Sequence, residues 1–294
     1  MSSHKKLSKK PMKSDSDNEI LKPVDFYQIE AMKPYLGGGS LEYKMKDKIN
    51  LKMPMRAVIT GASGTKKTNT AINIFRYANC FHKVYLFCAN KDQPLYNYMT
   101  DRIRAAAKNC DVPESEMLVV SNDLSNLPNL DTDINTSIHN LIIVDDFMNA
   151  KKKLSLVYDF FSRGRSKNVS IIFITQSFFR TPQEIRSCTD YIFFKRVNSI
   201  RDLERIINEY YHGFTNEILD FYNESVGESD NNFILFDLTA SNINKAIRKN
   251  FNEGYLTLSK PFVKPTSKSS KKKKVVKVIE PQKDNLDESS DIED

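Results

Sequence analysis

A loop of small and basic residues, TGASGTKKT at Thr60–Thr68, carries the clearest chemical signal in this sequence of 294 residues. The loop follows a short apolar run at Arg56–Thr60 and precedes a segment of helix length at Lys67–Asn79. The backbone N–H groups of such a loop, and the N-terminus of the helix after it, point at bound phosphate. In the Walker A pattern, GxxxxGK[ST], the lysine reaches the β- and γ-phosphates and the hydroxyl holds Mg²⁺. The sequence therefore predicts a site for ATP and Mg²⁺ on this loop.

Within the loop, Lys67 is the predicted phosphate contact and Thr68 is the predicted Mg²⁺ ligand. One position departs from the pattern, because Lys66 stands where a glycine is expected. Lysine can adopt helical backbone angles and adds positive charge, so we expect nucleotide binding to persist. The alternative is a loop of similar composition that binds no nucleotide. The predicted nucleotide-binding residues are Gly61, Ala62, Ser63, Gly64, Thr65, Lys66, Lys67 and Thr68.

A pair of carboxylates ends a second apolar run, LIIVDD at Leu141–Asp146. In P-loop ATPases an acid at the end of a strand holds Mg²⁺, and a second group orients the attacking water. We assign Asp145 to the metal and Asp146 to the role of general base. The alternative is that both acids are solvated loop residues. An apolar strand that ends in paired acids, downstream of a phosphate loop, favours the catalytic role.

Three further side chains flank a third apolar run at Ser170–Ser177. Gln176 lies near the end of this run, where open α/β sheets place groups that contact ligands. We expect it to sense the γ-phosphate or the attacking water. Arg163 and Arg165 precede the run and are candidates for an arginine finger that stabilises transition-state charge on the nucleotide of a neighbouring subunit. The alternative for each arginine is an exposed or DNA-facing cation.

These candidate residues lie at the ends of a series of short apolar runs. The runs are continuous rather than alternating, as expected for strands that are buried on both faces of a parallel sheet. Helix-length segments separate several of them, which predicts an α/β fold: a mostly parallel sheet with helices on both faces. The predicted strands are Arg56–Thr60, Val84–Cys88, Met117–Val120, Leu141–Val144, Ser170–Thr175 and Tyr191–Phe194, and the predicted helices are Lys67–Asn79, Pro94–Lys108, Lys152–Ser162 and Ile200–Tyr211.

Composition divides the chain into three zones. Residues 1–50 are predicted to be a flexible lysine-rich segment, 51–258 an ATPase domain, and 259–294 a disordered tail that is basic and then acidic. Much of the net charge of +7 lies near the ends, since residues 1–22 hold six lysines against three acids and 260–294 hold nine against seven. Net charge alone is therefore weak support for a DNA-binding surface on the fold. The run Lys271–Lys274 fits a nuclear localisation signal, a phosphate-binding arm or a solvated tail.

Several classes of protein are disfavoured by what the sequence lacks. No window approaches the roughly 18 uninterrupted apolar residues of a membrane span. The N-terminal lysines have no apolar segment behind them, so we expect no secretory signal. The four cysteines form no CxxC pair, which argues against zinc sites and disulfides and favours a reducing intracellular setting. The four histidines are too dispersed for a metal site.

The order of these motifs resembles that of the poxvirus-type viral DNA-packaging ATPases, which belong to the FtsK–HerA superfamily. The resemblance covers about Met55–Glu209 and is most distinctive in RGRSKNVSIIFITQSFFRTPQEIRSCTDYIFFKRVNS, at Arg163–Ser199. It implies a RecA-like core of the ASCE type with added strands, a homo-oligomeric ring, and ATP-driven movement of double-stranded DNA into a capsid. It also implies a capsid or portal partner and an intracellular setting, which is a viral factory in the host cytoplasm and also the virion, with the nucleus as an open alternative. Besides Lys66, the sequence departs at Ser166, where relatives often have histidine.

Other functions stay open on the residues alone. A helicase or a kinase can use the same P-loop core, although we identify neither the lid nor the acceptor pocket of a kinase. A non-hydrolysing nucleotide-binding or DNA-binding structural protein derived from such a motor would explain Lys66, but the rest of the catalytic set is retained. A DNA-binding scaffold could also act through the two terminal zones.

Overall fold

The computed structural model describes residues 44–46, 49–90, 92–147 and 153–258, so most of the two predicted terminal zones lies outside the described residues. In the described part of the chain, the first regular structure is an antiparallel pair, β1 (Lys44–Lys46) and β2 (Leu51–Met53). Strand β1 therefore falls inside the segment that the sequence predicts to be flexible. Among the described residues, no helix combines the length and apolar character that a membrane crossing requires.

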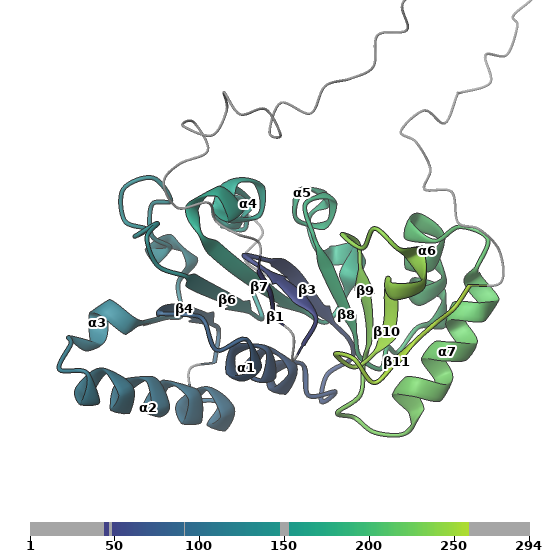
Figure 1. Cartoon of the computed structure of the whole chain (residues 1–294), viewed down its shortest axis with the longest axis horizontal. Coiled ribbons are helices and arrows are strands. Elements are labelled where there is room, and N and C mark those ends of the chain that lie inside the picture. Colours follow the sequence, from purple (N-terminus) through teal and green to yellow (C-terminus); the bar gives the residue numbers. More distant parts are fainter. Residues whose placement is uncertain (1–43, 47–48, 91, 148–152, 259–294) are drawn as a thin grey trace, which may run out of the picture.

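Nine strands of the described residues form one twisted sheet (Figure 1). They are β3 (Arg56–Thr60), β4 (Lys83–Cys88), β5 (Leu118–Ser121), β6 (Asn140–Asp145), β7 (Val169–Thr175), β8 (Tyr191–Phe194), β9 (Ile234–Asp237), β10 (Ile247–Lys249) and β11 (Gly254–Tyr255). Their order across the sheet is β11-β10-β9-β8-β3-β7-β6-β4-β5. All six predicted strands are present, whereas β9, β10 and β11 were not predicted individually.

The sheet has a parallel half and an antiparallel extension. Strands β3 to β8 pair in parallel, and β9 to β11 continue the sheet antiparallel from β8. Every residue of β7 is buried, in agreement with the continuous apolar run from which this strand was predicted. Strand β7 lies between β3 and β6, so the strand that precedes Gln176 separates the phosphate loop from the acidic pair.

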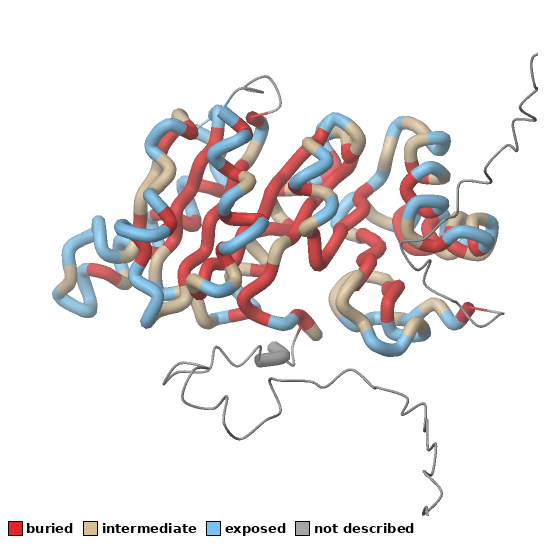
Figure 2. The backbone as a smooth tube through the Cα atoms, turned by 90° about the horizontal axis from the view of Figure 1, so that it is seen from above, coloured by how far each residue is buried: buried red, intermediate tan, exposed pale blue. Residues whose placement is uncertain are grey.

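Helices cover both faces of the sheet, as the sequence predicts. The α-helices are α1 (Lys67–Ala78), α2 (Pro94–Asn109), α3 (Glu114–Met117), α4 (Ser155–Arg163), α5 (Gln183–Ser187), α6 (Ile200–Tyr210) and α7 (Thr215–Gly227). The 3₁₀-helices are η3 (Leu124–Asn126), η4 (Gly164–Lys167), η5 (Phe178–Arg180) and η6 (Ile243–Lys245). Alternate strand residues point to opposite faces. Ala57 packs with α1 and α2, whereas Val58 packs with α4 to α7. The buried backbone runs through the strands, and the exposed backbone lies on the outer helical turns (Figure 2).

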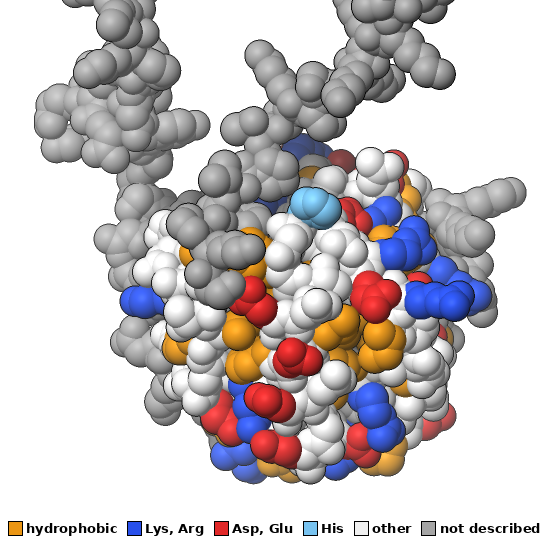
Figure 3. All heavy atoms as spheres, turned by 90° about the vertical axis from the view of Figure 1, so that its right-hand side faces the viewer, with side chains coloured by type: hydrophobic (Ala, Val, Ile, Leu, Met, Phe, Trp, Pro, Cys, Tyr) orange, Lys and Arg blue, Asp and Glu red, His pale blue; other side chains and the backbone are white. Residues whose placement is uncertain are grey.

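The end of the molecule formed by α6 and α7 is acidic. Helices α6 and α7 together hold six acidic residues against two arginines, Arg201 and Arg205, and from residue 206 to residue 244 the chain has seven acidic residues and neither lysine nor arginine. Figure 3 shows this end, where acidic side chains are scattered around a group of hydrophobic ones and basic side chains lie mostly toward the margins. A surface of this kind repels polyanions.

Candidate active site

The parallel strands bring the phosphate loop, the acidic pair and Gln176 to one edge of the sheet. The loop connects β3 to α1, the acidic pair ends β6, and Gln176 directly follows β7. A cavity of about 350 Å³ opens at this edge. Among its lining residues are the predicted Ser63, Gly64, Lys66, Lys67, Thr68, Asp145, Asp146 and Gln176. The carboxyl edge of an open α/β sheet is where ligands bind, and this site follows that rule.

The loop is closed by its own side chains. The Thr65 hydroxyl is buried and donates to the carbonyl of Ala62 at 2.8 Å. The Lys67 ammonium donates to the carbonyls of Gly61 and Ala62, at 2.9 Å and 2.7 Å. Burial lowers the pKa of Lys67, and the nearby carboxylates of Asp145 and Asp146 oppose that shift. The lysine charge is therefore held over the loop and close to both acids.

Lys66 adopts an unexpected backbone conformation. Its φ is 57° and its ψ is 38°, which is the left-handed region. The expectation that lysine takes ordinary helical angles here is wrong. The Walker A pattern has glycine at this position, and glycine reaches the left-handed region without a steric penalty. This chain therefore keeps the glycine conformation with a lysine, whose side chain is exposed.

At Gly61 the requirement for glycine comes from close packing, because there is no room for a side chain. A Cβ atom at Gly61 would lie 2.6 Å from Cβ of Lys195 and 3.0 Å from the Thr65 hydroxyl oxygen. Lys195 follows β8 and is fully buried, and its ammonium donates to the carbonyl of Asn231 at 2.7 Å. The segment after β8 thus packs directly against the phosphate loop, and it also accepts the Ala62 N–H at the Arg196 carbonyl, at 2.8 Å.

Thr68 and Asp145, the two predicted Mg²⁺ ligands, are in contact. The Thr68 hydroxyl donates to Oδ2 of Asp145 at 3.2 Å. Burial raises the pKa of Asp145, and hydrogen bonds from Tyr96 and Thr68 oppose that rise. One hydroxyl and one carboxylate, both oxygen donors, suit Mg²⁺, which takes few protein ligands and retains water and phosphate oxygens.

Tyr96 is the site residue that sequence reasoning missed. It lies in the first turn of α2 and donates its hydroxyl to Oδ2 of Asp145 at 2.6 Å. Burial raises the pKa of Tyr96 far above its usual value, with a further rise from the Asp145 charge. The hydroxyl is therefore a permanent donor. No motif marks this tyrosine, because the contact joins residues 49 positions apart.

Asp146 and Gln176 occupy neighbouring positions on the exposed rim of the cavity. Asp146 follows β6 and has a φ of 64°, a left-handed turn that directs the chain away from the strand. Gln176 follows β7, which is paired with β6 in register up to Asp145 and Ile174. Both side chains are exposed and line the cavity, where they can contact a bound ligand and solvent.

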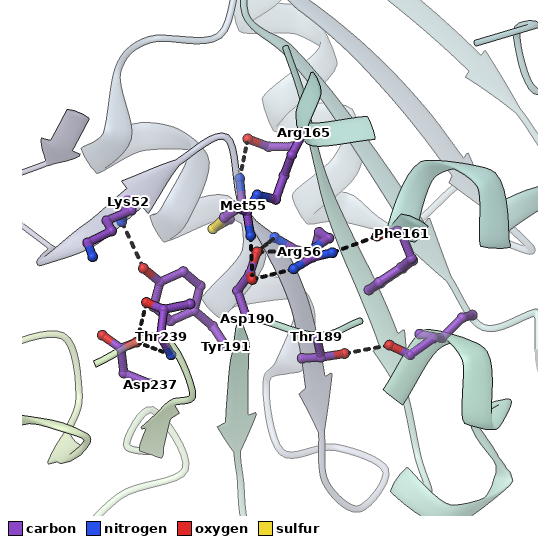
Figure 4. Close-up of polar contacts among 12 residues, drawn as sticks. Lys52, Met55, Arg56, Phe161, Arg165, Thr189, Asp190, Tyr191, Asp237 and Thr239 are labelled. Carbon is purple, nitrogen blue, oxygen red and sulfur yellow. Dashed lines mark hydrogen bonds and ion pairs between the residues drawn. The ribbon is translucent and has the colours of Figure 1, made fainter. Parts of the chain in front are cut away.

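Arg163 and Arg165 lie at the opposite edge of the sheet and do not line this cavity. They precede β7 at its amino end, and β7 spans roughly 20 Å at about 3.3 Å per residue. Arg163 pairs with Asp131 at 3.1 Å. Arg165 pairs with the buried Asp190 at 3.1 Å, and Asp190 also binds Arg56 at 2.7 Å (Figure 4). Neither arginine can reach the nucleotide site of its own chain without a large rearrangement.

The sequence is similar to those of poxvirus proteins. A model of the family described as "Poxvirus A32 protein" matches residues 42–223, more than half of the chain. The chain is 25% identical over 164 residues to the DNA packaging protein OPG160 of Monkeypox virus, covering 53% of each. It is 26% identical over 138 residues to the Variola virus protein of the same name, covering 45% of this chain and 49% of the relative. The chain thus spans about half the length of the curated relatives it matches.

Among solved structures, the chain is similar to the genome packaging NTPase B204 from Sulfolobus turreted icosahedral virus 2 in complex with AMPPCP. The identity is 13% and the TM-score 0.47, over 67% of this chain and 97% of that one. The strand, phosphate loop and helix at one edge of a mostly parallel sheet make the fold that of a P-loop NTPase. With the match over residues 42–223, the chain belongs to the poxvirus A32 protein family.

Proposed function

We propose that this protein hydrolyses ATP and uses the energy to move double-stranded DNA, so that a viral genome is packaged into its capsid. The relatives in Monkeypox virus and Variola virus are named DNA packaging proteins. The observation that carries the enzymatic part is one cavity that brings together residues from the ends of β6 and β7 and from the start of α1. They are Lys67, Thr68, Asp145, Asp146 and Gln176.

Each of these residues has a defined task in ATP hydrolysis. Lys67 and the loop N–H groups bind the β- and γ-phosphates, and Thr68 with Asp145 would hold Mg²⁺. Bound Mg²⁺ neutralises charge that develops on the phosphate oxygens. Asp146 accepts a proton from the attacking water while the water oxygen bonds to the γ-phosphorus and the bond to the β–γ bridging oxygen breaks. Gln176 hydrogen-bonds that water or the γ-phosphate.

A homo-oligomeric ring is part of the proposal, because the candidate arginine fingers lie far from the site of their own chain. In a ring, Arg163 or Arg165 would serve the nucleotide of the adjacent subunit. DNA would be held by sequence-independent contacts to its phosphates, away from the acidic α6–α7 end. A capsid or portal protein is the proposed partner, and a viral factory in the host cytoplasm is the proposed setting.

A second candidate is a nucleotide-binding protein that no longer hydrolyses ATP. Lys66 favours it, because a side chain occupies a left-handed position where the Walker A pattern has glycine. Asp146 and Gln176 favour hydrolysis, because both line the cavity where they can contact an attacking water, whereas Thr68 and Asp145 would hold Mg²⁺ with or without turnover. A helicase on the same core would have the same nucleotide site as a packaging motor, so only its action on DNA would distinguish the two.

The test is steady-state ATP hydrolysis by the purified protein, with and without double-stranded DNA. Lys67→Ala removes the phosphate contact, and Lys108→Ala is the matched control, because Lys108 is an exposed lysine outside the cavity. We expect DNA-stimulated hydrolysis in the wild type and in Lys108→Ala, and none in Lys67→Ala. Tight ATP binding without turnover under every condition would favour the second candidate. Strand separation of a duplex with a single-stranded overhang would indicate a helicase.

A further inference from the structure

The shortest hydrogen bond to the metal carboxylate comes from outside the P-loop motifs. The Tyr96 hydroxyl lies 2.6 Å from Oδ2 of Asp145, whereas the Thr68 hydroxyl lies 3.2 Å from the same atom. Tyr96 is 1% exposed and packs in the hydrophobic cluster that joins α1 and α2 to the sheet. Its ring is therefore fixed by packing, and its hydroxyl is fixed with it.

Metal binding would change the two hydrogen bonds to Asp145 in different ways. The Thr68 oxygen is itself an expected Mg²⁺ ligand, so its bond to Asp145 is weakened or redirected when the metal binds. The terminal torsion of an aspartate is broad, so a carboxylate without another partner can rotate. Mg²⁺ requires nearly ideal octahedral geometry and tolerates such rotation poorly. Tyr96 is not an expected ligand and can keep its hydrogen bond throughout.

We propose that Tyr96 is a positioning residue that holds the Asp145 carboxylate in the orientation that Mg²⁺ requires, an inference that rests on the proposed function. Tyr96 lines the cavity, and its proposed role is exerted through the hydrogen bond to Asp145. Partners of this kind typically contribute about 10–100-fold to metal affinity or activity. The first turn of α2 thus contributes to the metal site, although no motif of the sequence extends to it.

The test is Tyr96→Phe, which keeps the buried ring and removes only the hydroxyl. Tyr191→Phe is the matched control. Tyr191 is also 1% exposed, and its hydroxyl accepts a hydrogen bond from the Lys52 N–H at 2.9 Å, at the opposite edge of the sheet. Binding of a fluorescent ATP analogue is measured in EDTA and across a Mg²⁺ titration, together with the Mg²⁺ dependence of hydrolysis.

We expect Tyr96→Phe to bind the analogue in EDTA as the wild type does, which also shows that the variant is folded. The Mg²⁺ concentration for half-maximal binding and hydrolysis is expected to rise about 10–100-fold in this variant alone. If the wild type depends on Mg²⁺ and Tyr96→Phe shows the same dependence, the inference is overturned and the proposed function is left intact. A loss of binding in EDTA would also overturn it, because Tyr96 would then shape the nucleotide pocket and not the metal site. Wild-type protein without any Mg²⁺ dependence would refute the proposed function and the inference together.

Discussion

Lys66 offers a direct test of the loop geometry. If residue 66 is left-handed, the Lys66→Gly variant should be more stable than Lys66→Ala, and if it is right-handed, the order should be reversed. Lys66→Gly and Lys66→Ala both remove the ammonium group, so their difference reports on the backbone alone. At a φ of 57° a residue with a Cβ atom is strained by about 1–2 kcal/mol. Glycine loses about 0.4–1 kcal/mol through its greater freedom in the unfolded chain. Lys66→Gly should therefore be more stable than Lys66→Ala by about 1 kcal/mol.

The assay is thermal unfolding of both variants under identical conditions. For a domain of this size, about 1 kcal/mol corresponds to roughly 2–4 °C in Tm. The matched control is Arg76, an exposed residue within α1, where alanine should be more stable than glycine by about 1 kcal/mol. If Lys66→Ala melts above Lys66→Gly, as at Arg76, then residue 66 is in a right-handed conformation and the reasoning fails. ATP binding by the two variants should show the same order, because the loop N–H groups depend on this turn.

Three further predictions concern the surroundings of the loop. Gly61→Ala should destabilise the fold by about 1–3 kcal/mol and weaken ATP binding, because its Cβ would lie 2.6 Å from Cβ of Lys195; unchanged chemical denaturation would contradict the close packing. Burial lowers the pKa of Lys195 to about 8, so the unfolded chain binds more protons above that pH, and stability should rise from about pH 8 to pH 10 in the wild type relative to Lys195→Met. Parallel pH curves for these two proteins would refute that assignment. Finally, if Arg163 is the arginine that acts across a subunit interface, Arg163→Ala and Lys67→Ala should each be inactive alone and a mixture of the two should recover hydrolysis. A mixture without activity would argue against that role.

The sequence predicts the parallel half of the sheet well, because strands buried on both faces are continuous apolar runs. Strands β9 to β11 are two to four residues long, and their pairing depends on β8, so no local pattern marks them individually. Helix α7 was also missed, although it packs against α6 and β9, its neighbours in the chain. The extent of the two terminal zones stays a prediction, because most of them lies outside the described residues.

Sequence reasoning identified those site residues that can be recognised from their residue type and from their position after a predicted strand. Lys67, Thr68 and Asp145 all line the cavity. The left-handed conformation of Lys66 was not foreseen, because lysine rarely adopts it and a residue with a Cβ atom is expected to have a negative φ. Tyr96 was missed for a different reason, since its contact with Asp145 exists only after α2 has packed against the sheet.

The central position of β7 has a mechanical consequence. The strand is hydrogen-bonded to β3 on one side and to β6 on the other, so it cannot slide or bend independently of its neighbours. Gln176 follows one end of this rod, and Arg165 precedes the other. In the proposed ring, a movement of Gln176 on phosphate release would therefore move β7 together with β3 and β6, and would reach the Arg165 end as a shift of the central strands as one unit. Adjacent subunits would then hydrolyse ATP in sequence, because β7 connects the glutamine of one nucleotide site to the arginine that serves the next.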